Sequence, residues 1–206
     1  MPRSRFQKLP AADRDHLLDI ALDRFAAEGL ERASLNEILA EAGLSKGSYY
    51  YYFEDKEDLF ATVLEREVDK LFAAVPMPTF ERISAKQFWP LVEGHIARWR
   101  EHFLDSRPLL AIARHVDAAM RAKPRFLQLT ELGRTMWRPM LVAGRRLGCI
   151  RTDLSLDSLL ELVEAADAAV DRMMYWSNPK PITRKSFSAH VDLAFDTFRR
   201  LLVPHD

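Results

Sequence analysis

Apolar side chains recur at three- and four-residue steps along most of this sequence, and this period constrains the fold more than any other feature. Leu17, Ala21 and Phe25 begin one such series, and Leu59 and Val63 belong to another. An α-helix places residues with this spacing on one face. Only 7 glycines occur in 206 residues, and alternating Val, Ile and Thr runs between turn residues, which would indicate strands, are not found. We therefore expect an all-α fold.

The first part of the chain predicts a group of three helices with defined ends. We expect these helices over residues 11–28, 35–42 and 46–52. Gly29 and Gly43 suit the residue just past a helix end, because glycine adopts positive φ without strain. Ser34 and Ser45 can each cap the helix that follows, and Glu37 completes a capping box with Ser34. Two short helices joined by a tight glycine turn follow from this pattern.

The rest of the chain predicts longer helices. From the cap residue Asp55, apolar residues at helical spacing predict a helix over 55–75. The segment 75–84 contains two prolines and is the expected bend or linker. Two final helices, over 155–176 and 184–203, carry wide apolar stripes, and their alanines would allow another helix to approach closely.

Residues 34–56 form the segment with the clearest chemistry. A helix, a glycine turn and a second short helix would expose Lys46, Ser48 and several tyrosines. A DNA major groove about 12 Å wide admits one helix, whose side chains contact base edges while hydroxyls and cations hold phosphates. The run Tyr49–Tyr52 cannot be entirely buried, because consecutive helical positions point about 100° apart. Some tyrosines must face solvent or a partner, whereas padding of a small helical core is the alternative.

The stretch from Leu17 to Leu64 resembles the N-terminal DNA-binding domain of the tetracycline-repressor (TetR) family of bacterial transcriptional regulators. The resemblance rests on a Ser cap, an apolar pair, the sequence AGLSKGS, an aromatic cluster ending in Phe, and a Lys-Glu pair that opens the next helix. It covers about a quarter of the chain. It implies a three-helix helix-turn-helix domain over 1–56 and a helical effector-binding and dimerisation domain over 57–206.

The resemblance also implies roles for individual residues. Ser34 and Asn36 would open the helix that crosses the DNA backbone. The residues expected to contact DNA are Ser34, Asn36, Ser45, Lys46, Gly47, Ser48, Tyr50, Tyr51, Tyr52 and Lys56. Among them, Lys46, Gly47, Ser48 and Tyr51 would face bases, and Tyr50, Tyr52 and Lys56 would hold phosphates. Leu44 and Phe53 would be core. Family members often have Ala where this chain has Leu39, and Leu where it has Tyr49. The change at Tyr49 would affect the packing of the recognition helix.

The charge distribution shapes the expected DNA binding. The chain carries 30 Lys and Arg against 30 Asp and Glu, and residues 1–56 have eight against ten. A ligand-independent architectural protein would need a broadly basic surface, which this balance does not support. Residues 1–8 carry three cations and no acid, so an arm with Arg3 and Arg5 can reach phosphates or a minor groove. A solubilising terminus is the alternative reading of this arm.

For the C-terminal part, the resemblance implies a homodimer that holds a small-molecule effector. A dimer would face a pseudo-palindromic operator with its recognition helices about one DNA turn apart. Apolar residues on the last two helices are the expected dimer contacts: Leu162, Ala166, Val170, Val191, Ala194 and Phe198. Aromatic and methionine residues are the expected lining of a pocket for an apolar or aromatic effector: Trp99, Phe103, Met120, Met136, Trp137, Met140 and Met173. Core packing is the alternative for each of these seven residues.

Other functions have less support in the sequence. The motifs HExxH, GxxxxGK(S/T) and GxGxxG are not present, so we expect no enzyme. His95, His102 and His115 have no partner at metal-ligand spacing, and the single cysteine, Cys149, cannot form an intramolecular disulfide. We expect no cofactor, no metal and no membrane span, and a cytoplasmic location. The expected protein is a repressor released from DNA by its effector, with an activator as the alternative.

Overall fold

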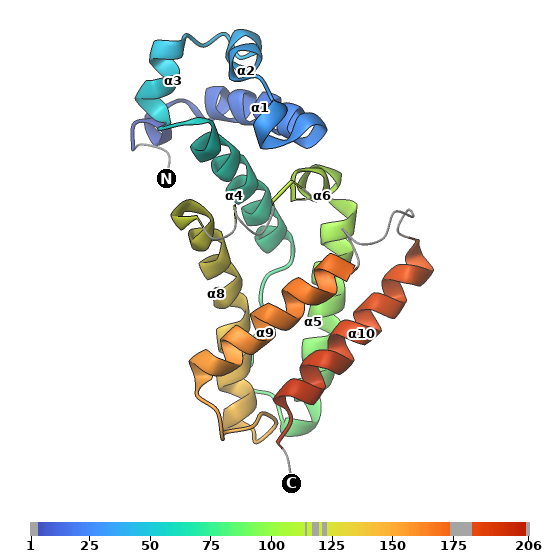
Figure 1. The fold of residues 1–206 in the computed structure, drawn as a ribbon. Helices are drawn as coiled ribbons and strands as arrows, with labels where there is room; N and C mark the ends of the chain where they lie inside the picture. The colour runs from blue at the N-terminus through green and yellow to red at the C-terminus, as the bar shows by residue number, and fades with distance from the viewer. Residues whose placement is uncertain (1–3, 114, 117–119, 121–122, 174–182, 205–206) are drawn as a thin grey trace. The chain divides into compact units, whose positions relative to one another are not determined.

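A computed structural model describes residues 4–113, 115–116, 120, 123–173 and 183–204 of the chain (Figure 1). Regular structure within these ranges is helical, with no strand among them, so the expectation of an all-α fold is confirmed. None of the helices in these ranges is both long and apolar enough to cross a lipid bilayer.

The N-terminal helices begin and end close to the predicted positions. They are the 3₁₀ turn η1 (Phe6–Lys8), α1 (Ala11–Arg32), α2 (Leu35–Glu41), α3 (Lys46–Tyr52) and α4 (Lys56–Ala74). Helix α1 is broken at Gly29, whose φ of 77° and ψ of 175° are not helical, and one more turn follows before Ala33. The glycine therefore ends the first helix as predicted, and the added turn carries the chain toward the cap of α2.

The C-terminal helices follow a non-helical segment at 75–84, as the two prolines there predicted. They are α5 (Ala85–Asp105), α6 (Arg107–Ala113), α8 (Pro124–Arg146), α9 (Leu156–Asp171) and α10 (Arg184–Leu202). Pro124 is the first residue of α8, a position where the missing N–H of proline costs nothing. Pro90 lies inside α5, and Pro139 lies inside α8. The sequence pattern did not predict a proline in the interior of either helix.

The first of two compact units consists of Met1–Ala74 and Phe103–Leu129. Within it α1 packs against α4 and α6, and α2 packs against α1 and α3 (Figure 1). Its core is formed by buried apolar side chains that include Leu17, Ala21, Phe25, Ile38, Phe53, Leu59, Phe60, Leu109 and Ile112. The predicted DNA-binding domain, residues 1–56, lies inside this unit, which also contains α4, α6 and the first turns of α8.

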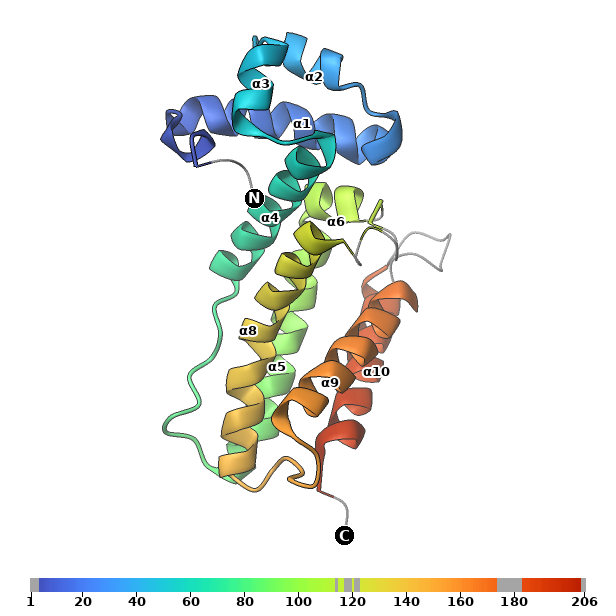
Figure 2. The ribbon, with the colours of Figure 1, turned by 60° about the vertical axis from the view of Figure 1, so that its left-hand side comes forward.

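The second compact unit consists of Val75–His102 and Thr130–Asp206. Its helices α5, α8, α9 and α10 lie side by side in one bundle (Figure 2). The ring of Trp137 on α8 lies 5.0 Å from that of Phe198 on α10, and Arg100 on α5 pairs with Asp167 on α9 at 2.5 Å. Because these contacts join helices that are distant in sequence, the core of this unit depends on tertiary packing.

Candidate nucleic-acid interface and ligand pocket

Helix α2 begins with the Ser34 cap that the sequence predicted, whereas the Glu37 side chain pairs with Arg24 and does not complete the predicted capping box. The backbone N–H of Glu37 donates to Oγ of Ser34 at 3.4 Å. The Glu37 carboxylate accepts a hydrogen bond from Nη1 of Arg24 at 3.0 Å, so α2 is tied to α1 through this side chain. Arg24 also contacts Glu41 at 3.1 Å, at the other end of α2. One arginine on α1 therefore holds both ends of the helix that precedes the turn.

The turn into α3 is also as predicted. Gly43 adopts a φ of 67°, and the N–H of Leu44 donates to the Leu39 carbonyl at 2.9 Å. The N–H of Ser48 donates to Oγ of Ser45 at 3.1 Å, and the two serine hydroxyls lie 3.0 Å apart. Leu44 is half-buried rather than fully buried. A positive-φ glycine and a serine cap thus set the direction of α3 by local interactions alone.

Helix α3 has one buried side and one exposed side. Tyr49 is fully buried, whereas Tyr50 and Tyr51 are 50% and 48% exposed. Lys46 and Gly47 are also exposed. We call the four exposed residues Lys46, Gly47, Tyr50 and Tyr51 the reading face. It combines a cation, two phenol hydroxyls and a position without a side chain, and it projects away from the helices behind it.

Tyr49 occupies a core position where TetR-family members often have leucine. Its ring stacks on Phe53 with centroids 5.4 Å apart and an angle of 23° between the planes. Its hydroxyl is buried and has no hydrogen-bond partner among the described residues. Burial raises the pKa of Tyr49, and the charges of Asp55 and Asp58 add to the effect. The departure from the usual family residue therefore keeps α3 in place but leaves one polar atom unsatisfied.

The N-terminal arm lies against α3. Phe6 is buried, with its ring 4.7 Å from Phe53 and 6.1 Å from Tyr52. The guanidinium carbon of Arg5 lies 4.3 Å from the centre of the Tyr51 ring, which is a cation–π geometry. Sequence reasoning missed Phe6, and the one signal for it was a single aromatic residue in an otherwise basic arm. Arg3, the other arm residue considered, lies outside the described residues.

Lys56 is held at the end of α1. Its ammonium donates to the carbonyls of Glu31 and Ala33, each at 3.1 Å. These carbonyls lie in the last turn of α1 and at its end, where backbone acceptors have no intrahelical partner. Lys56 therefore has a structural role that the sequence did not predict, and its phosphate contact stays a prediction. The remaining expected DNA residues, Ser34, Asn36 and Tyr52, are half-buried, exposed and half-buried respectively.

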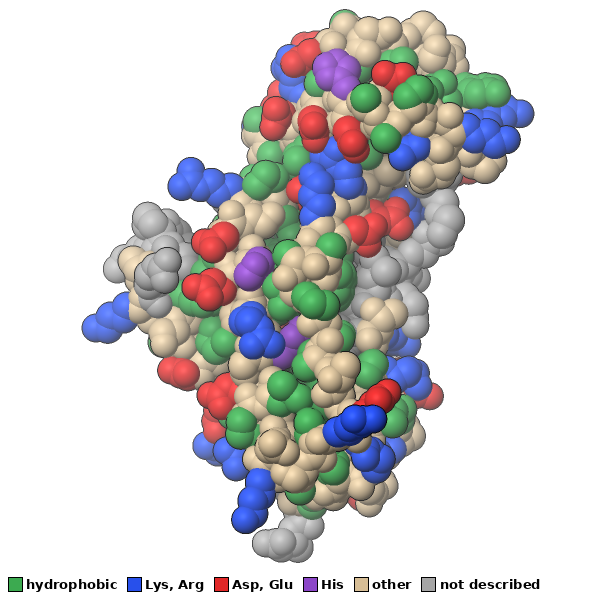
Figure 3. Space-filling model, turned by 180° about the vertical axis from the view of Figure 1, so that it is seen from behind, with side chains coloured by type: hydrophobic (Ala, Val, Ile, Leu, Met, Phe, Trp, Pro, Cys, Tyr) green, Lys and Arg blue, Asp and Glu red, His purple; other side chains and the backbone are tan. Residues whose placement is uncertain are grey.

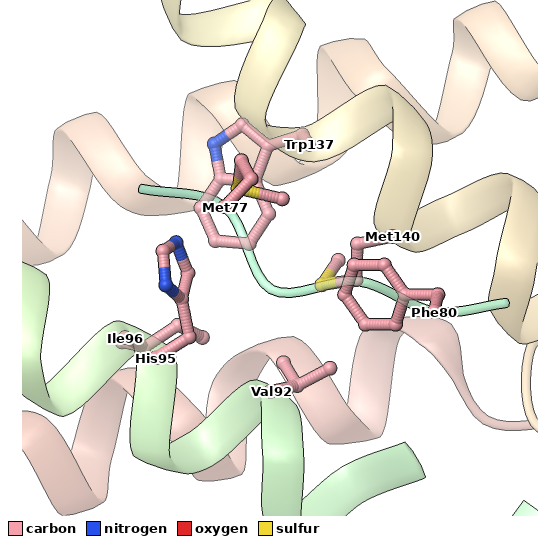
Figure 4. Close-up of a pocket in the computed structure, with 7 residues that line it drawn as sticks. All are labelled: Met77, Phe80, Val92, His95, Ile96, Trp137 and Met140. Carbon is pink, nitrogen blue, oxygen red and sulfur yellow. The ribbon is translucent and has the colours of Figure 1, made fainter. Parts of the chain in front are cut away.

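The second unit contains a small apolar pocket (Figure 4). We call it the His95 pocket, and it is lined by Met77, Phe80, Val92, His95, Ile96, Trp137 and Met140. Three α5 residues, Val92, His95 and Ile96, line the pocket, and the non-helical segment 75–84 supplies Met77 and Phe80 (Figure 4). The enclosed volume is about 10 Å³. The pocket is therefore closed around about the space of one water molecule.

The expected effector residues divide between several places. Trp137 and Met140 line the His95 pocket. Phe103 and Met120 are buried in the first unit, Trp99 is half-buried, and Met173 is 53% exposed. The side chain of Met136 is outside what the structure describes. The expectation that these residues share one cavity therefore needs correction, because helical spacing gives the face of each residue but not the helix that the face meets.

The expected dimer contacts divide in a similar way. Val170, Val191, Ala194 and Phe198 are buried within the chain itself. Their apolar stripes pack inside the bundle, so these four residues are not surface on which a second copy can lie. Leu162 is 41% exposed, Ala166 is half-buried, and a further leucine on α10, Leu193, is 40% exposed. The exposed apolar surface of α9 and α10 therefore includes Leu162 and Leu193.

The remaining polar candidates have separate environments. His102 is exposed, and His115 bonds to the carbonyl of Ala26 at 3.2 Å. Cys149 is half-buried, and burial raises the pKa of its thiol. Within the described ranges, no group of three or more His, Cys, Asp or Glu side chains is arranged to hold a metal ion. The face in Figure 3 carries charges of both signs close together, so no single broad basic patch covers it.

A helix-turn-helix with an exposed reading face, carried by an all-helical chain, defines a DNA-binding transcriptional regulator. The family model for bacterial regulatory proteins of the tetR family matches residues 17–63. Residues 17–63 therefore form a helix-turn-helix domain of the TetR type, and the chain is similar to TetR-family transcriptional regulators.

Curated relatives and solved structures extend this likeness. The transcriptional repressor KstR2 of Rhodococcus jostii is 29% identical over 147 residues, which cover 70% of this chain and 71% of that protein. The regulator AcrR of Shigella flexneri is 44% identical over 52 residues, which cover 25% of this chain and 24% of that protein.

A TetR regulator from Agrobacterium tumefaciens has a TM-score of 0.61 at 22% identity and covers 94% of this chain and 96% of its own. The fatty acid degradation regulator FadR from Bacillus halodurans has a TM-score of 0.63 at 16% identity, with 90% and 97% covered. These structures share the fold over 90% or more of this chain.

Proposed function

We propose that this protein is a cytoplasmic, non-enzymatic homodimer that represses transcription and leaves its operator when a small apolar or aromatic molecule binds. In this proposal residues 1–56 contact DNA, and residues 57–206 bind the effector and form the dimer. The observation that carries the proposal is the reading face of α3, whose side chains are exposed although neighbouring Tyr49 is fully buried.

The reading face supplies the chemistry that a major groove requires. Lys46 and Tyr51 are exposed side chains that can donate to base edges, and Gly47 lets the backbone approach closely. Tyr50 and Tyr52, with Ser34 and Asn36 near the start of α2, are assigned to phosphates, which position the protein without reading sequence. Ser45 and Ser48 start α3 and complete the contact set. The guanidinium of Arg5, which lies over the Tyr51 ring, adds a positive charge beside the reading face.

We place the dimer contact on the exposed parts of α9 and α10. Leu162 and Leu193 are large apolar side chains left in solvent on two helices that pack together. Ala166 lies one turn from Leu162 and would let a facing helix approach. Four helices, two from each copy, would then pack by ordinary bundle rules. A twofold dimer of this kind faces a pseudo-palindromic operator.

The ligand response is assigned to the His95 pocket. A ligand changes DNA affinity only through its different affinities for the two conformations of the protein. One wall of the pocket is the segment 75–84, which continues directly from α4, and α4 follows the recognition helix after a short turn. Insertion of a ligand beside Met77 and Phe80 would displace this segment and, through the chain, α4.

Selection of bound sequences from a random DNA library tests the DNA-binding part of this proposal. Enrichment of a pseudo-palindrome is expected, and Lys46→Ala and Tyr51→Ala should each weaken binding to it by about tenfold, from the loss of one or two base contacts. Arg82→Ala is the matched control, because Arg82 is an exposed cation in the segment 75–84. Unchanged affinity in both α3 variants would remove the assignment of the reading face.

Sedimentation of a double variant tests the dimer contact. Leu162→Asp with Leu193→Asp should give a folded monomer, since unpaired charges buried in an interface are costly. Val142→Asp is the control, because Val142 is 51% exposed on α8. A dimer that persists in the double variant would move the interface elsewhere. A reporter gene behind the selected operator then separates repression from activation by the direction of the change in transcription.

A further inference from the structure

His95 is the polar side chain in an otherwise apolar pocket. The residue is 5% exposed, and neither Nδ1 nor Nε2 has a hydrogen-bond partner in the described part of the chain. Its ring points toward the side chains of Met77 and Trp137 (Figure 4). A buried polar group without a partner destabilises a fold, so such groups in native structures need an explanation.

The state of the ring follows from its surroundings. Burial, and then the positive charge of Arg98, lower the pKa of His95 below the ordinary value of 6.5. Arg98 is on the same helix, and the lining residues from segment 75–84 and from α8 have no titratable side chain. The imidazole is therefore neutral near pH 7. A neutral imidazole has one N–H donor and one nitrogen acceptor.

The lining determines which charge a ligand can carry. Met77, Phe80, Val92, Ile96, Trp137 and Met140 provide hydrocarbon, indole and thioether surface but no counter-ion. A carboxylate or ammonium buried among them would lose its hydration without a compensating partner, which costs far more than one hydrogen bond returns. An uncharged oxygen can accept the imidazole N–H at little cost, and a hydroxyl can also donate to the second nitrogen.

We propose that the His95 pocket binds an uncharged, mainly apolar molecule with one hydroxyl or carbonyl oxygen, and that His95 hydrogen-bonds this oxygen. The inference names the ligand class of the pocket and rests on the ligand response proposed above. The six apolar residues supply affinity through burial, while His95 selects the oxygen and fixes the orientation.

The closed pocket must open for such a ligand. Ligand pockets commonly hold about 300–1,000 Å³, whereas the enclosed volume is about 10 Å³. The segment 75–84 is the wall of the pocket that is not helical. Its hydrogen bonds to other elements include one from Arg146 on α8 to the carbonyl of Phe80 at 2.6 Å and those between Ser84 and Gln87 at the start of α5. Movement of Met77 and Phe80 with this segment enlarges the pocket and leaves α5 and α8 in place.

Three probes of one ring system test the ligand class on the full chain. They are 2-naphthol, 2-methylnaphthalene, which replaces the hydroxyl with a methyl of similar size, and 2-naphthoate, which is charged. Labelled methionine methyl groups report binding by NMR, because Met77 and Met140 line the pocket and exposed Met173 does not. We expect 2-naphthol to bind about tenfold more tightly than 2-methylnaphthalene, from one hydrogen bond that satisfies a buried partner. It should also bind more tightly than 2-naphthoate.

Variants assign this preference to one side chain. His95→Leu should reduce the tenfold ratio to about one, and His95→Gln, which keeps a donor and an acceptor, should retain part of it. His102→Leu is the matched control, since His102 lies on the same helix but is exposed. If His95→Leu does not fold, the ratio in the unmodified protein and in His95→Gln still decides. Equal affinities for 2-naphthol and 2-methylnaphthalene, tighter binding of 2-naphthoate, or no binding of any probe would overturn the inference.

DNA binding is measured separately, so the two proposals fail in different ways. The probe titration contains no DNA and depends only on the pocket. A chain that selects no operator refutes the proposed regulator but leaves the probe ratios valid. If 2-naphthol binds with the expected preference but the operator complex persists, the ligand class stands and the pocket is not the switch.

Discussion

Helix α3 and the His95 pocket use their side chains in different ways. On α3, Tyr49 holds the helix in the core while Lys46 and Tyr51 face solvent. In the pocket, the residues assigned to the ligand, such as Trp137 and Val92, are themselves core residues. The side chains proposed to face DNA can therefore change without loss of stability, whereas those proposed to face the ligand cannot. Substitutions in the pocket must preserve the packing of the bundle. Substitutions on the reading face are free of this requirement.

Truncation of one residue from each region gives the largest expected contrast. Trp137→Ala should lower the free energy of unfolding by about 3–5 kcal/mol, because a buried aromatic ring is replaced by a cavity. Trp137 is 4% exposed and packs against Phe198. Tyr51→Ala should change the free energy of unfolding by no more than about 0.5 kcal/mol, as for most surface sites. Chemical denaturation of both variants measures the difference, and similar losses would break the comparison.

Glycines in the second unit test how tightly its core is packed. A Cβ on Gly144 would lie 2.6 Å from Cζ of Phe88 and would also meet Ile150, so Gly144→Ala should cost about 1–3 kcal/mol through overpacking. Gly94→Ala is the control inside the same bundle, because its Cβ meets only the end of the Arg98 side chain at 3.8 Å. This second change should stabilise α5 by about 0.5–1 kcal/mol. Thermal melts that rank the two variants in reverse would contradict the packing.

The buried hydroxyl of Tyr49 predicts a smaller effect in the first unit. Tyr49→Phe removes a polar atom without a partner and keeps the ring stack, so it should stabilise the protein by about 1 kcal/mol at neutral pH. The raised pKa of Tyr49 in the folded state means that stability falls as the pH rises above 10.0, the ordinary value for tyrosine. Unfolding between pH 9 and 11 should show this fall in the native chain and less of it in Tyr49→Phe. Equal slopes would show that the hydroxyl has a partner.

His95 predicts the smallest effect, at the opposite end of the pH scale. Its pKa is lowered on folding, so the unfolded chain binds the proton more readily. The contribution of neutral His95 is fully present above pH 6.5 and is lost as the pH falls through its lower folded value. Unfolding measured from pH 7.5 to 5 should be less steep in His95→Leu than in His102→Leu. The same steepness in both would place the acid sensitivity elsewhere.

Much of the helix-turn-helix was predictable because its signals are local. The caps Ser34 and Ser45 act on amides three residues away, and the glycine turn at Gly43 depends on its own φ. Such interactions can be read from neighbouring letters. Phe6 and the ammonium of Lys56 were not predictable in this way, since each meets partners more than twenty residues distant.

The pocket and the dimer surface were less predictable for a related reason. Periodicity identified apolar stripes on the last two helices, yet Phe198 and Ala194 turned out to face the bundle of their own chain. Met77 and Phe80 line the pocket from a segment that the sequence marked only as a bend. The identity of an apolar side chain does not indicate which residue it will pack against, because hydrophobic burial is not directional.

The sequence alone determined the helical class, the ends of the first helices and the glycine turn before α3, because each depends on interactions within a few residues. The tertiary structure decided which tyrosine is buried, which stripe faces inward and where His95 lies. Those outcomes depend on the shapes of surfaces formed by distant segments, which become neighbours only when the chain has folded.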